Sequence, residues 1–196
     1  TLFRSRCVAF TKNITESLNV LLKGLLRPGD HVLVSAMEHN AVMRPLQQIG
    51  TELTAGNAPT EAITFSRIPC DAEGALCLDA LPQLVRPNTK AIIMTHASNV
   101  CGTVQPLAQV GSFCQDHNLK FIVDSAQSAG VVPINMQAMH IDARMQQRLD
   151  RRPDRCGVAL DWSVTPQALP GRQDGHAVVT NRARQQNLVA RLRQIP

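Results

Sequence analysis

Short apolar runs alternate with amphipathic stretches along the first 143 residues of this 196-residue chain. Two runs, "AIIMTH" (91–96) and "KFIVDS" (120–125), are apolar at successive positions, which is typical of strands covered on both faces. Between them, "PLAQVGSFCQDHN" (106–118) is expected to form a helix. Buried strands separated by helices form βαβ units, so the sequence predicts an α/β fold around a mostly parallel sheet.

The remaining elements of this region continue the alternation. Four leucines between residues 18 and 25 recur with the spacing of one helix face, which predicts a helix over "ITESLNVLLKGLL" (14–26). Two further strands are expected at "HVLVS" (31–35) and "AITFSRIP" (62–69), and two short helices at "AVMRPLQQIG" (41–50) and "LDALPQLV" (78–85).

The charge of the chain is unevenly distributed. Residues 1–143 hold 10 Lys and Arg against 11 Asp and Glu, whereas residues 144–196 hold 10 Arg, no Lys and 4 Asp. We therefore predict a domain over residues 8–143 and an irregular, poorly ordered Arg-rich tail over 144–196. The tail is either a divergent segment or the product of a frameshift in GC-rich coding DNA.

Several classes of protein are disfavoured by composition. There is no apolar run of about 18 residues, so no membrane-spanning helix is expected. The first residues lack the long apolar centre of a signal peptide. The six cysteines form no C-x-x-C pair and no metal-ligand spacing, which favours reduced thiols and a cytoplasmic location.

Polar residues gather where the predicted strands end. These positions are "SAMEHN" (35–40), "THASNVCG" (95–102) and "DSAQ" (124–127), and parallel sheets bind ligands at their carboxyl ends. A fourth stretch, "FTKNITE" (10–16), opens the first helix, where free N–H groups and the helix dipole favour an anion such as phosphate.

Asp124 is the most informative of these polar residues. It ends an apolar strand, and burying a carboxylate costs free energy unless a cation or hydrogen-bond donors meet it. An acidic group that faces the protonated nitrogen of a planar heterocycle would explain its position.

Four ordered segments carry a family resemblance: "FTKNITESLN", "GDHVLVSAMEHNAVMRPL", "NTKAIIMTHASNVCGTVQPL" and "VDSAQSAGVVPINM". In order and separation they resemble the cysteine desulfurase-like branch of the class V aminotransferase family, which consists of fold type I enzymes that use pyridoxal 5′-phosphate (PLP). The match covers about residues 8–143. The resemblance implies part of the large α/β domain of these enzymes.

The resemblance also implies roles for six cofactor-binding residues. Ile14 and Thr15 match the phosphate-binding pair, with only the backbone N–H of Ile14 in contact. His39 matches the histidine that stacks on the pyridine ring. Asp124 matches the partner of the pyridinium nitrogen, Gln127 the partner of the ring hydroxyl, and Asn99 a residue near that hydroxyl and the substrate.

Each of these residues also has a purely structural interpretation. Asp124 is equally well explained as a helix N-cap, and Asn99 as a turn residue. His39 alone is typical of a hydrogen-bonded surface or core histidine, and Thr15 of the first turn of a helix.

Three neighbouring residues are expected to play supporting roles. Cys101 is interpreted as a buried structural thiol rather than a nucleophile. His96 is expected to support the site by packing or hydrogen bonding, and Glu38 to accept hydrogen bonds rather than act as a base.

The resemblance stops after "HIDA", which ends at residue 143. The family continues with a strand, a turn and the lysine that forms a Schiff base with PLP, but the sequence has no lysine after Lys120. Lys120 precedes its strand and is expected at the opposite end from the site. No catalytic residue is therefore assigned.

Three functions remain open from the sequence. The first is a fragment of a desulfurase-like enzyme. The intact enzyme would remove sulfur from cysteine as an enzyme persulfide, release alanine and act as a homodimer. This chain, which lacks the Schiff-base lysine, is expected to be inactive. The second is a non-catalytic PLP-binding or interaction module. The third is nucleic-acid or anion binding by the tail, which salt-dependent binding would reveal; Trp162 is its single aromatic residue, which argues against it.

Overall fold

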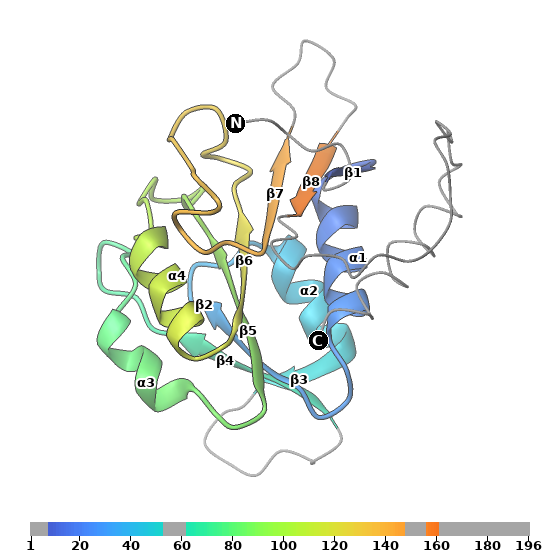
Figure 1. The fold of residues 1–196 in the computed structure, drawn as a ribbon, viewed down its shortest axis with the longest axis vertical. Helices are drawn as coiled ribbons and strands as arrows, with labels where there is room; N and C mark the ends of the chain where they lie inside the picture. The colour runs from blue at the N-terminus through green and yellow to red at the C-terminus, as the bar shows by residue number, and fades with distance from the viewer. Residues whose placement is uncertain (1–7, 53–61, 148–155, 161–196) are drawn as a thin grey trace, which may run out of the picture.

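The computed structural model describes residues 8–52, 62–147 and 156–160 (Figure 1). In chain order the elements are β1 (Val8–Thr11), α1 (Ile14–Leu25), β2 (His31–Ser35), α2 (Asn40–Ile49), β3 (Gly50–Glu52), β4 (Ile63–Ile68), the 3-10 turn η2 (Leu78–Ala80), α3 (Leu81–Leu84), β5 (Thr89–Thr95), α4 (Leu107–Asp116), β6 (Lys120–Asp124), β7 (Ala143–Gln147) and β8 (Cys156–Leu160).

The strands form one sheet in the order β1-β8-β7-β6-β5-β2-β4-β3. Six neighbours, from β7 to β3, pair in parallel, while β8 runs antiparallel to both β7 and β1. The predicted α/β fold with a mostly parallel sheet is confirmed. Because β1, β2, β5 and β6 point the same way, their carboxyl ends lie along one edge of the sheet.

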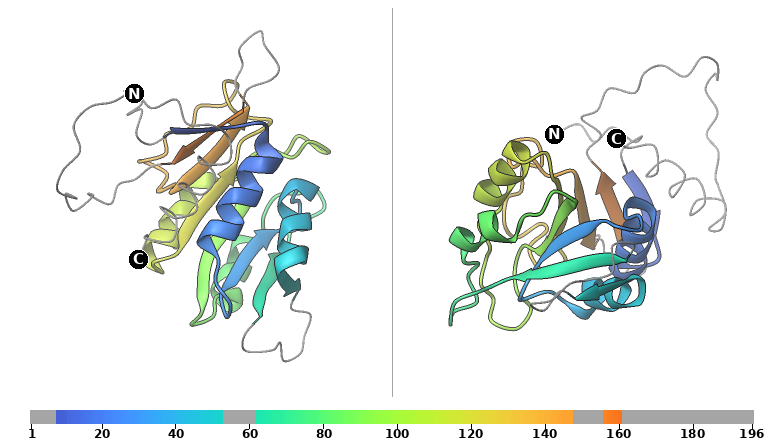
Figure 2. Two further views of the ribbon diagram at one scale, coloured as in Figure 1. Left: turned by 90° about the vertical axis from the view of Figure 1, so that its right-hand side faces the viewer. Right: turned by 90° about the horizontal axis from the view of Figure 1, so that it is seen from below.

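Helices cover both faces of the sheet (Figures 1 and 2). The leucine face of α1 packs with α2 on one face, against alternate strand residues such as Val32, Ile93 and Ile122. On the other face, α3 and α4 cover the intervening residues, among them Ile92 and Phe121. Burial of successive residues on opposite faces explains why the central strands are apolar throughout.

The beginning of α1 is defined by a capping arrangement that also shapes the edge of the sheet. The Asn13 side chain accepts a hydrogen bond from the N–H of Glu16 at 2.8 Å, and the Glu16 carboxylate accepts from the N–H of Lys12 at 2.5 Å. These bonds satisfy backbone donors before and within the first turn. The turn after β1 is thereby held in one conformation.

The sheet continues beyond residue 143, so the predicted irregular tail does not hold for the described residues 144–147 and 156–160, which belong to β7 and β8. Ala143 and Met145 of β7 are buried in the core under α1, and β8 pairs with β7 and β1. The sequence of β7, "ARMQQ", has only two apolar residues, which are too few to predict a strand buried on one face. Residues 161–196 lie outside the described residues.

None of the described helices is both long and apolar enough to cross a membrane.

Gly111 is the point of closest approach between α4 and the loop that precedes β7. A Cβ atom at this position would lie 1.9 Å from the carbonyl oxygen of Met139. Although alanine has a better helix propensity than glycine, this overlap forces the loop away from the helix. We expect Gly111→Ala to lower the free energy of unfolding by about 2 kcal/mol.

Urea denaturation followed by circular dichroism measures this loss, with the exposed neighbour Ser112→Ala as the matched control. A Gly111→Ala protein as stable as wild type would show that the contact between helix and loop is not tight.

Candidate functional site

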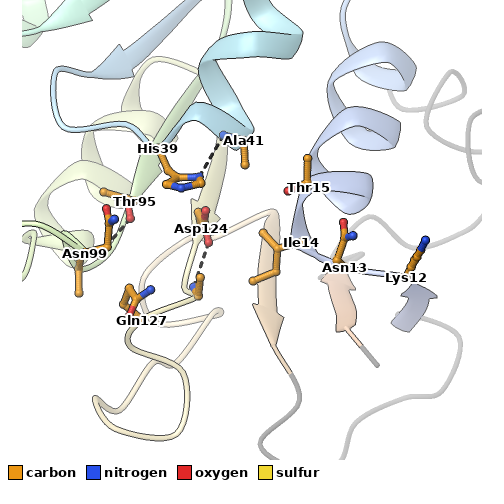
Figure 3. A pocket seen from close by; sticks show the side chains of 12 residues that line it. Lys12, Asn13, Ile14, Thr15, His39, Ala41, Thr95, Asn99, Asp124 and Gln127 are labelled. Carbon is orange, nitrogen blue, oxygen red and sulfur yellow. Dashed lines mark hydrogen bonds between the residues drawn. The ribbon is translucent and has the colours of Figure 1, made fainter. Parts of the chain in front are cut away.

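A pocket of about 260 Å³ opens at the carboxyl edge of the sheet (Figure 3). Its walls come from the turn after β1, the beginning of α2, the end of β5 with the following loop, and the end of β6. The lining residues are Lys12, Asn13, Ile14, Thr15, His39, Ala41, Thr95, Ala97, Asn99, Asp124, Ala126 and Gln127. Segments more than 100 residues apart in the sequence therefore meet in one cavity.

The six residues predicted to bind the cofactor all line this pocket. The structure places Ile14 and Thr15 at one end and Asn99 and Gln127 at the other, with Asp124 between them (Figure 3). The parallel arrangement of the strands is what brings these residues together. Their contact with a cofactor stays a prediction.

Asp124 lies at the last position of β6 with only 3% of its surface exposed. Its Oδ1 accepts a hydrogen bond from the N–H of Ala126 at 2.9 Å, which is a turn contact rather than the helix N-cap of the structural interpretation, because the described residues between β6 and β7 form no helix. No ion pair to Asp124 is formed within the part of the chain that the structure describes. Its carboxylate is therefore buried in the pocket wall without an ion pair from these residues.

Burial raises the pKa of Asp124 above its ordinary value. The hydrogen bond from Ala126 and the nearby ring of His39 act in the opposite direction, because both favour the carboxylate form. A bound cation would favour the ionised form further. These properties suit a site that receives a positively charged group.

His39 caps the beginning of α2 from within the pocket wall. Its Nδ1 accepts a hydrogen bond from the N–H of Ala41 at 3.0 Å, so this nitrogen carries no proton. The bond fixes the ring near Asp124, as Figure 3 shows. The expected hydrogen-bonded role and the ring-facing role of His39 are therefore compatible.

The opposite end of the pocket is formed by the turn before α1 and its first residues. The N–H groups of Ile14 and Thr15 belong to the first turn, where the helix itself offers no acceptors. The Ile14 side chain packs partly against the core, and Lys12 adds a cationic side chain to the lining. Free donors, the helix dipole and a cation together favour an anion here.

Three kinds of lining residue were not predicted from the sequence. Lys12 was placed in the turn but given no role in the pocket, and Thr95 was not considered. Ala41, Ala97 and Ala126 are small residues that leave room at the pocket wall. Their proximity follows from strand register, for example from the pairing of Thr95 with Asp124, which composition does not reveal.

The supporting roles expected for Glu38 and His96 agree with the structure. Glu38 accepts hydrogen bonds from the Ser35 hydroxyl and the Thr95 N–H. His96 is buried, and its Nδ1 lies 2.7 Å from the hydroxyl of Ser128. Burial lowers the pKa of His96, so the neutral ring is favoured. Both residues hold the loops that form the pocket.

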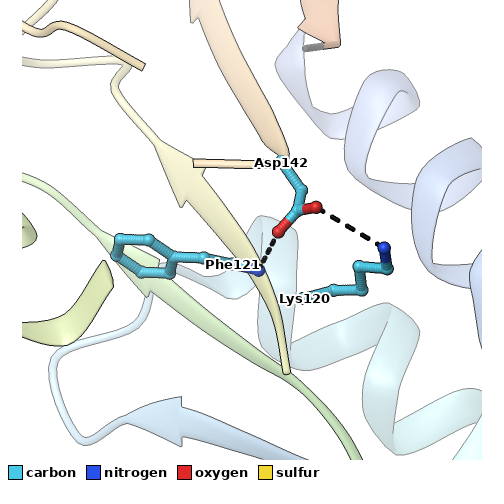
Figure 4. A network of polar contacts seen from close by, with 3 residues as sticks. All are labelled: Lys120, Phe121 and Asp142. Carbon is cyan, nitrogen blue, oxygen red and sulfur yellow. Dashed lines mark hydrogen bonds and ion pairs between the residues drawn. The ribbon is translucent and has the colours of Figure 1, made fainter. Parts of the chain in front are cut away.

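Lys120 begins β6 and Asp142 directly precedes β7, so both lie at the opposite edge of the sheet from the pocket, and Figure 4 shows their contact. Lys120 Nζ is 3.6 Å from Asp142 Oδ1, and Oδ2 of Asp142 accepts a hydrogen bond from the N–H of Phe121 at 2.8 Å. Lys120 begins β6, whereas Asp124 ends it. The prediction that Lys120 is remote from the site is confirmed.

Cys101 is exposed, so the expectation of a buried structural thiol is wrong. It follows Asn99 in the loop after β5, where Gly102 takes a positive φ of 75° and turns the chain back. Hydrogen bonds from Ser98 and Thr103 lower the pKa of the Cys101 thiol to about 7. A turn that projects its side chains outward is not evident from the apolar strand before it.

We expect Cys101 to be more reactive than Cys70 or Cys114 near neutral pH. Burial raises the pKa of both comparison thiols, so they hold less of the nucleophilic thiolate. Alkylation by iodoacetamide should be at least about tenfold faster at Cys101, as peptide mass spectrometry can measure. Ser98→Ala should slow it, and equal rates at all three thiols would contradict this assignment.

Comparisons with known proteins agree with the fold. A model of the family "Aminotransferase class-V" matches residues 4–145. The cysteine desulfurase of Shigella sonnei is 32% identical over 143 residues, which are 69% of this chain and 32% of that protein. The cysteine desulfurase IscS of Dictyoglomus turgidum is 30% identical over 142 residues, covering 69% and 33%.

Solved structures give the same result. The apo structure of the cysteine desulfurase from Thermococcus onnurineus superposes with a TM-score of 0.68 at 26% identity, covering 79% of this chain and 38% of that one. The cysteine desulfurase CsdA of Escherichia coli has a TM-score of 0.68 at 22% identity, covering 95% and 51%, and supports the fold alone.

The chain spans about a third of the length of the curated relatives it matches. The family match nevertheless includes every lining residue of the pocket, from Lys12 to Gln127. With its sheet order, its pocket at the carboxyl edge and this match, the chain belongs to the class V aminotransferase family and contains a cysteine desulfurase-like segment of it.

Proposed function

We propose that this chain carries the ring-binding and phosphate-binding half of a PLP site of the cysteine desulfurase type, and that it binds PLP without a covalent link. The observation that carries the proposal is the buried carboxylate of Asp124, which forms no ion pair with the described residues, in a pocket whose other end offers free helix N–H groups. PLP presents a basic ring nitrogen at one side and a phosphate at another, so the two ends of the pocket fit it.

The ring end is suited to hold a proton. When bound, PLP supplies a protonated ring that withdraws electrons from a substrate carbon. Asp124 would hold that proton at the ring nitrogen, because an ionised carboxylate favours the cation beside it. His39 would cover one face of the ring, and Gln127 would meet its hydroxyl.

The phosphate end is suited to a dianion. The N–H groups of Ile14 and Thr15 and the positive end of the α1 dipole would bind the phosphate oxygens. Lys12 would add a cation there. This assignment gives Lys12 an electrostatic role at the phosphate rather than a covalent one.

The lysines of the chain support the non-covalent part of the proposal. The sequence has four, at positions 12, 23, 90 and 120. Lys12 lines the phosphate end of the pocket, Lys23 lies in the last turn of α1, Lys90 near the beginning of β5, and Lys120 at the beginning of β6. None of them lies beside the ring, so the chain as written would not carry out sulfur removal.

The activity of longer relatives belongs to the same proposal. Two relatives are named cysteine desulfurases, and we infer that the pocket accepts an amino acid next to the cofactor. A complete protein of this type would release sulfur from cysteine and act as a homodimer. In this chain, Asn99 is the lining residue that would face both ring and substrate.

Borohydride reduction tests the proposal directly. The full chain is titrated with PLP, followed by protein fluorescence and absorbance, and then reduced and analysed by intact mass. We expect saturable binding at one site and no stoichiometric adduct. One specific adduct on a single lysine would contradict the non-covalent assignment, and the absence of saturable binding would contradict the site itself.

A ligand without an aldehyde provides the matched control. In 4′-deoxypyridoxine 5′-phosphate a methyl group replaces the aldehyde, so this compound cannot link to any amine. Because no covalent bond contributes to the binding of either compound, we expect the two dissociation constants to agree within about threefold, which corresponds to about 0.7 kcal/mol. A large preference for PLP would instead indicate covalent capture.

A further inference from the structure

Glu38 joins two of the strand ends that form the pocket. It lies directly before His39 in the loop between β2 and α2. Its Oε1 accepts a hydrogen bond from the Ser35 hydroxyl at 2.5 Å and another from the backbone N–H of Thr95 at 2.6 Å. Ser35 ends β2 and Thr95 ends β5, so one carboxyl oxygen connects two neighbouring strands at the edge where ligands bind.

The other oxygen of Glu38 has a different environment. Oε2 is buried and has no hydrogen-bond partner among the described residues. A buried carboxylate would leave half of its charge without a donor, which is costly. A neutral acid suits the observed arrangement better, with Oε1 as the carbonyl that accepts two bonds and Oε2 as the hydroxyl.

The charged groups around Glu38 favour the same state. Burial raises the pKa of Glu38 to about 8, and the nearby carboxylate of Asp124 adds to the effect. The hydrogen bonds from Ser35 and Thr95 act in the opposite direction but are outweighed. Among the described residues, the charged group that acts on Glu38 is Asp124 on β6, and the ring of His39 in turn lies beside Asp124.

We propose that Glu38 is a positioning residue of this site: as a neutral acid it fastens the loop that carries His39 to strand β5 and leaves Asp124 as the carboxylate that faces the ligand. The role in ligand binding rests on the proposed function, whereas the protonation and the fastening do not. Two adjacent carboxylates would repel each other, so protonation of Glu38 keeps the negative charge on the residue that lines the pocket.

The first experiment uses the full chain without ligand. Carboxyl-carbon NMR of glutamate-labelled protein should show Glu38 titrating near pH 8, and Glu38→Gln should remove that resonance. Hydrogen exchange at the Thr95 amide should stay slow in Glu38→Gln, whose amide oxygen can still accept, and become at least about tenfold faster in Glu38→Ala. Titration of Glu38 near its ordinary value, or unchanged exchange in Glu38→Ala, would overturn the proposal.

The second experiment measures binding of 4′-deoxypyridoxine 5′-phosphate. Glu38→Gln should bind within about threefold of wild type and Glu38→Ala about tenfold more weakly, with exposed Glu73→Gln as the control. In a double-mutant cycle, Glu38→Ala and His39→Ala should be less than additive, because Glu38 acts through the loop that holds His39.

Additive losses, or equal losses in the glutamine and alanine variants, would overturn the positioning role. Lack of binding by wild type would instead overturn the proposed function, and the ligand-free experiment would still decide the state of Glu38. If Glu38→Ala does not fold, the titration and Glu38→Gln decide it.

Discussion

Asp124→Asn will weaken the binding of 4′-deoxypyridoxine 5′-phosphate by about 30-fold, because a charge-assisted hydrogen bond is replaced by a neutral one worth about 2 kcal/mol less. Asparagine has the same shape as aspartate, and its oxygen can still accept the hydrogen bond from Ala126. The loop after β6 should therefore keep its conformation. The loss in affinity then reports the charge of Asp124 on the ring nitrogen.

Isothermal titration calorimetry measures this change, and Asp142→Asn is the matched control. Asp142→Asn makes the same change from carboxylate to amide, but Asp142 lies at the opposite edge of the sheet. There it accepts a hydrogen bond from the N–H of Phe121 and forms an ion pair with Lys120. We expect that control to alter stability without altering affinity. Binding by Asp124→Asn within about threefold of wild type would show that the ring nitrogen does not meet this residue.

A second large effect is expected in the pH dependence of stability. The pKa of Glu38 is raised from 4.5 to about 8 in the folded chain, so between these values the folded protein holds a proton that the unfolded chain has released. Stability supplied by this proton is complete at low pH and is lost as pH rises. The slope is about 1.4 kcal/mol per pH unit, or about 4 kcal/mol between about pH 5 and pH 8.

Histidines oppose this trend in the wild-type curve. Burial lowers the pKa of His31 to about 4, so His31 makes the fold more stable as pH rises through the range up to its ordinary value of 6.5. Wild type and Glu38→Gln both contain His31, so the contribution of His31 to the unfolding free energy cancels when the two proteins are compared at the same pH. The difference in unfolding free energy, wild type minus Glu38→Gln, should therefore fall steadily with rising pH.

Urea denaturation at a series of pH values measures the difference, with Glu73→Gln as a control in which the exposed carboxyl should give no slope. A constant difference between wild type and Glu38→Gln would show that Glu38 is ionised throughout.

The sequence by itself determined the central sheet and six of the residues that line the pocket. Strands such as β5 and β6 are apolar at successive positions because both of their faces are covered, so their sequence is enough to identify them. Asp124 was informative for the same reason, since a polar residue at the end of such a strand lies at the edge where ligands bind. The leucine face of α1 was equally clear.

Other features were decided by the tertiary structure alone. Strand β7 is stabilised by the burial of Ala143 and Met145 under α1 and by pairing with β8, neither of which its short polar sequence reveals. The exposure of Cys101 depends on how its loop turns, and the environment of the Glu38 carboxyl group depends on Thr95, which is 57 residues away. Local sequence specifies periodicity and turn chemistry, but burial and pKa depend on partners that only the folded sheet brings into contact.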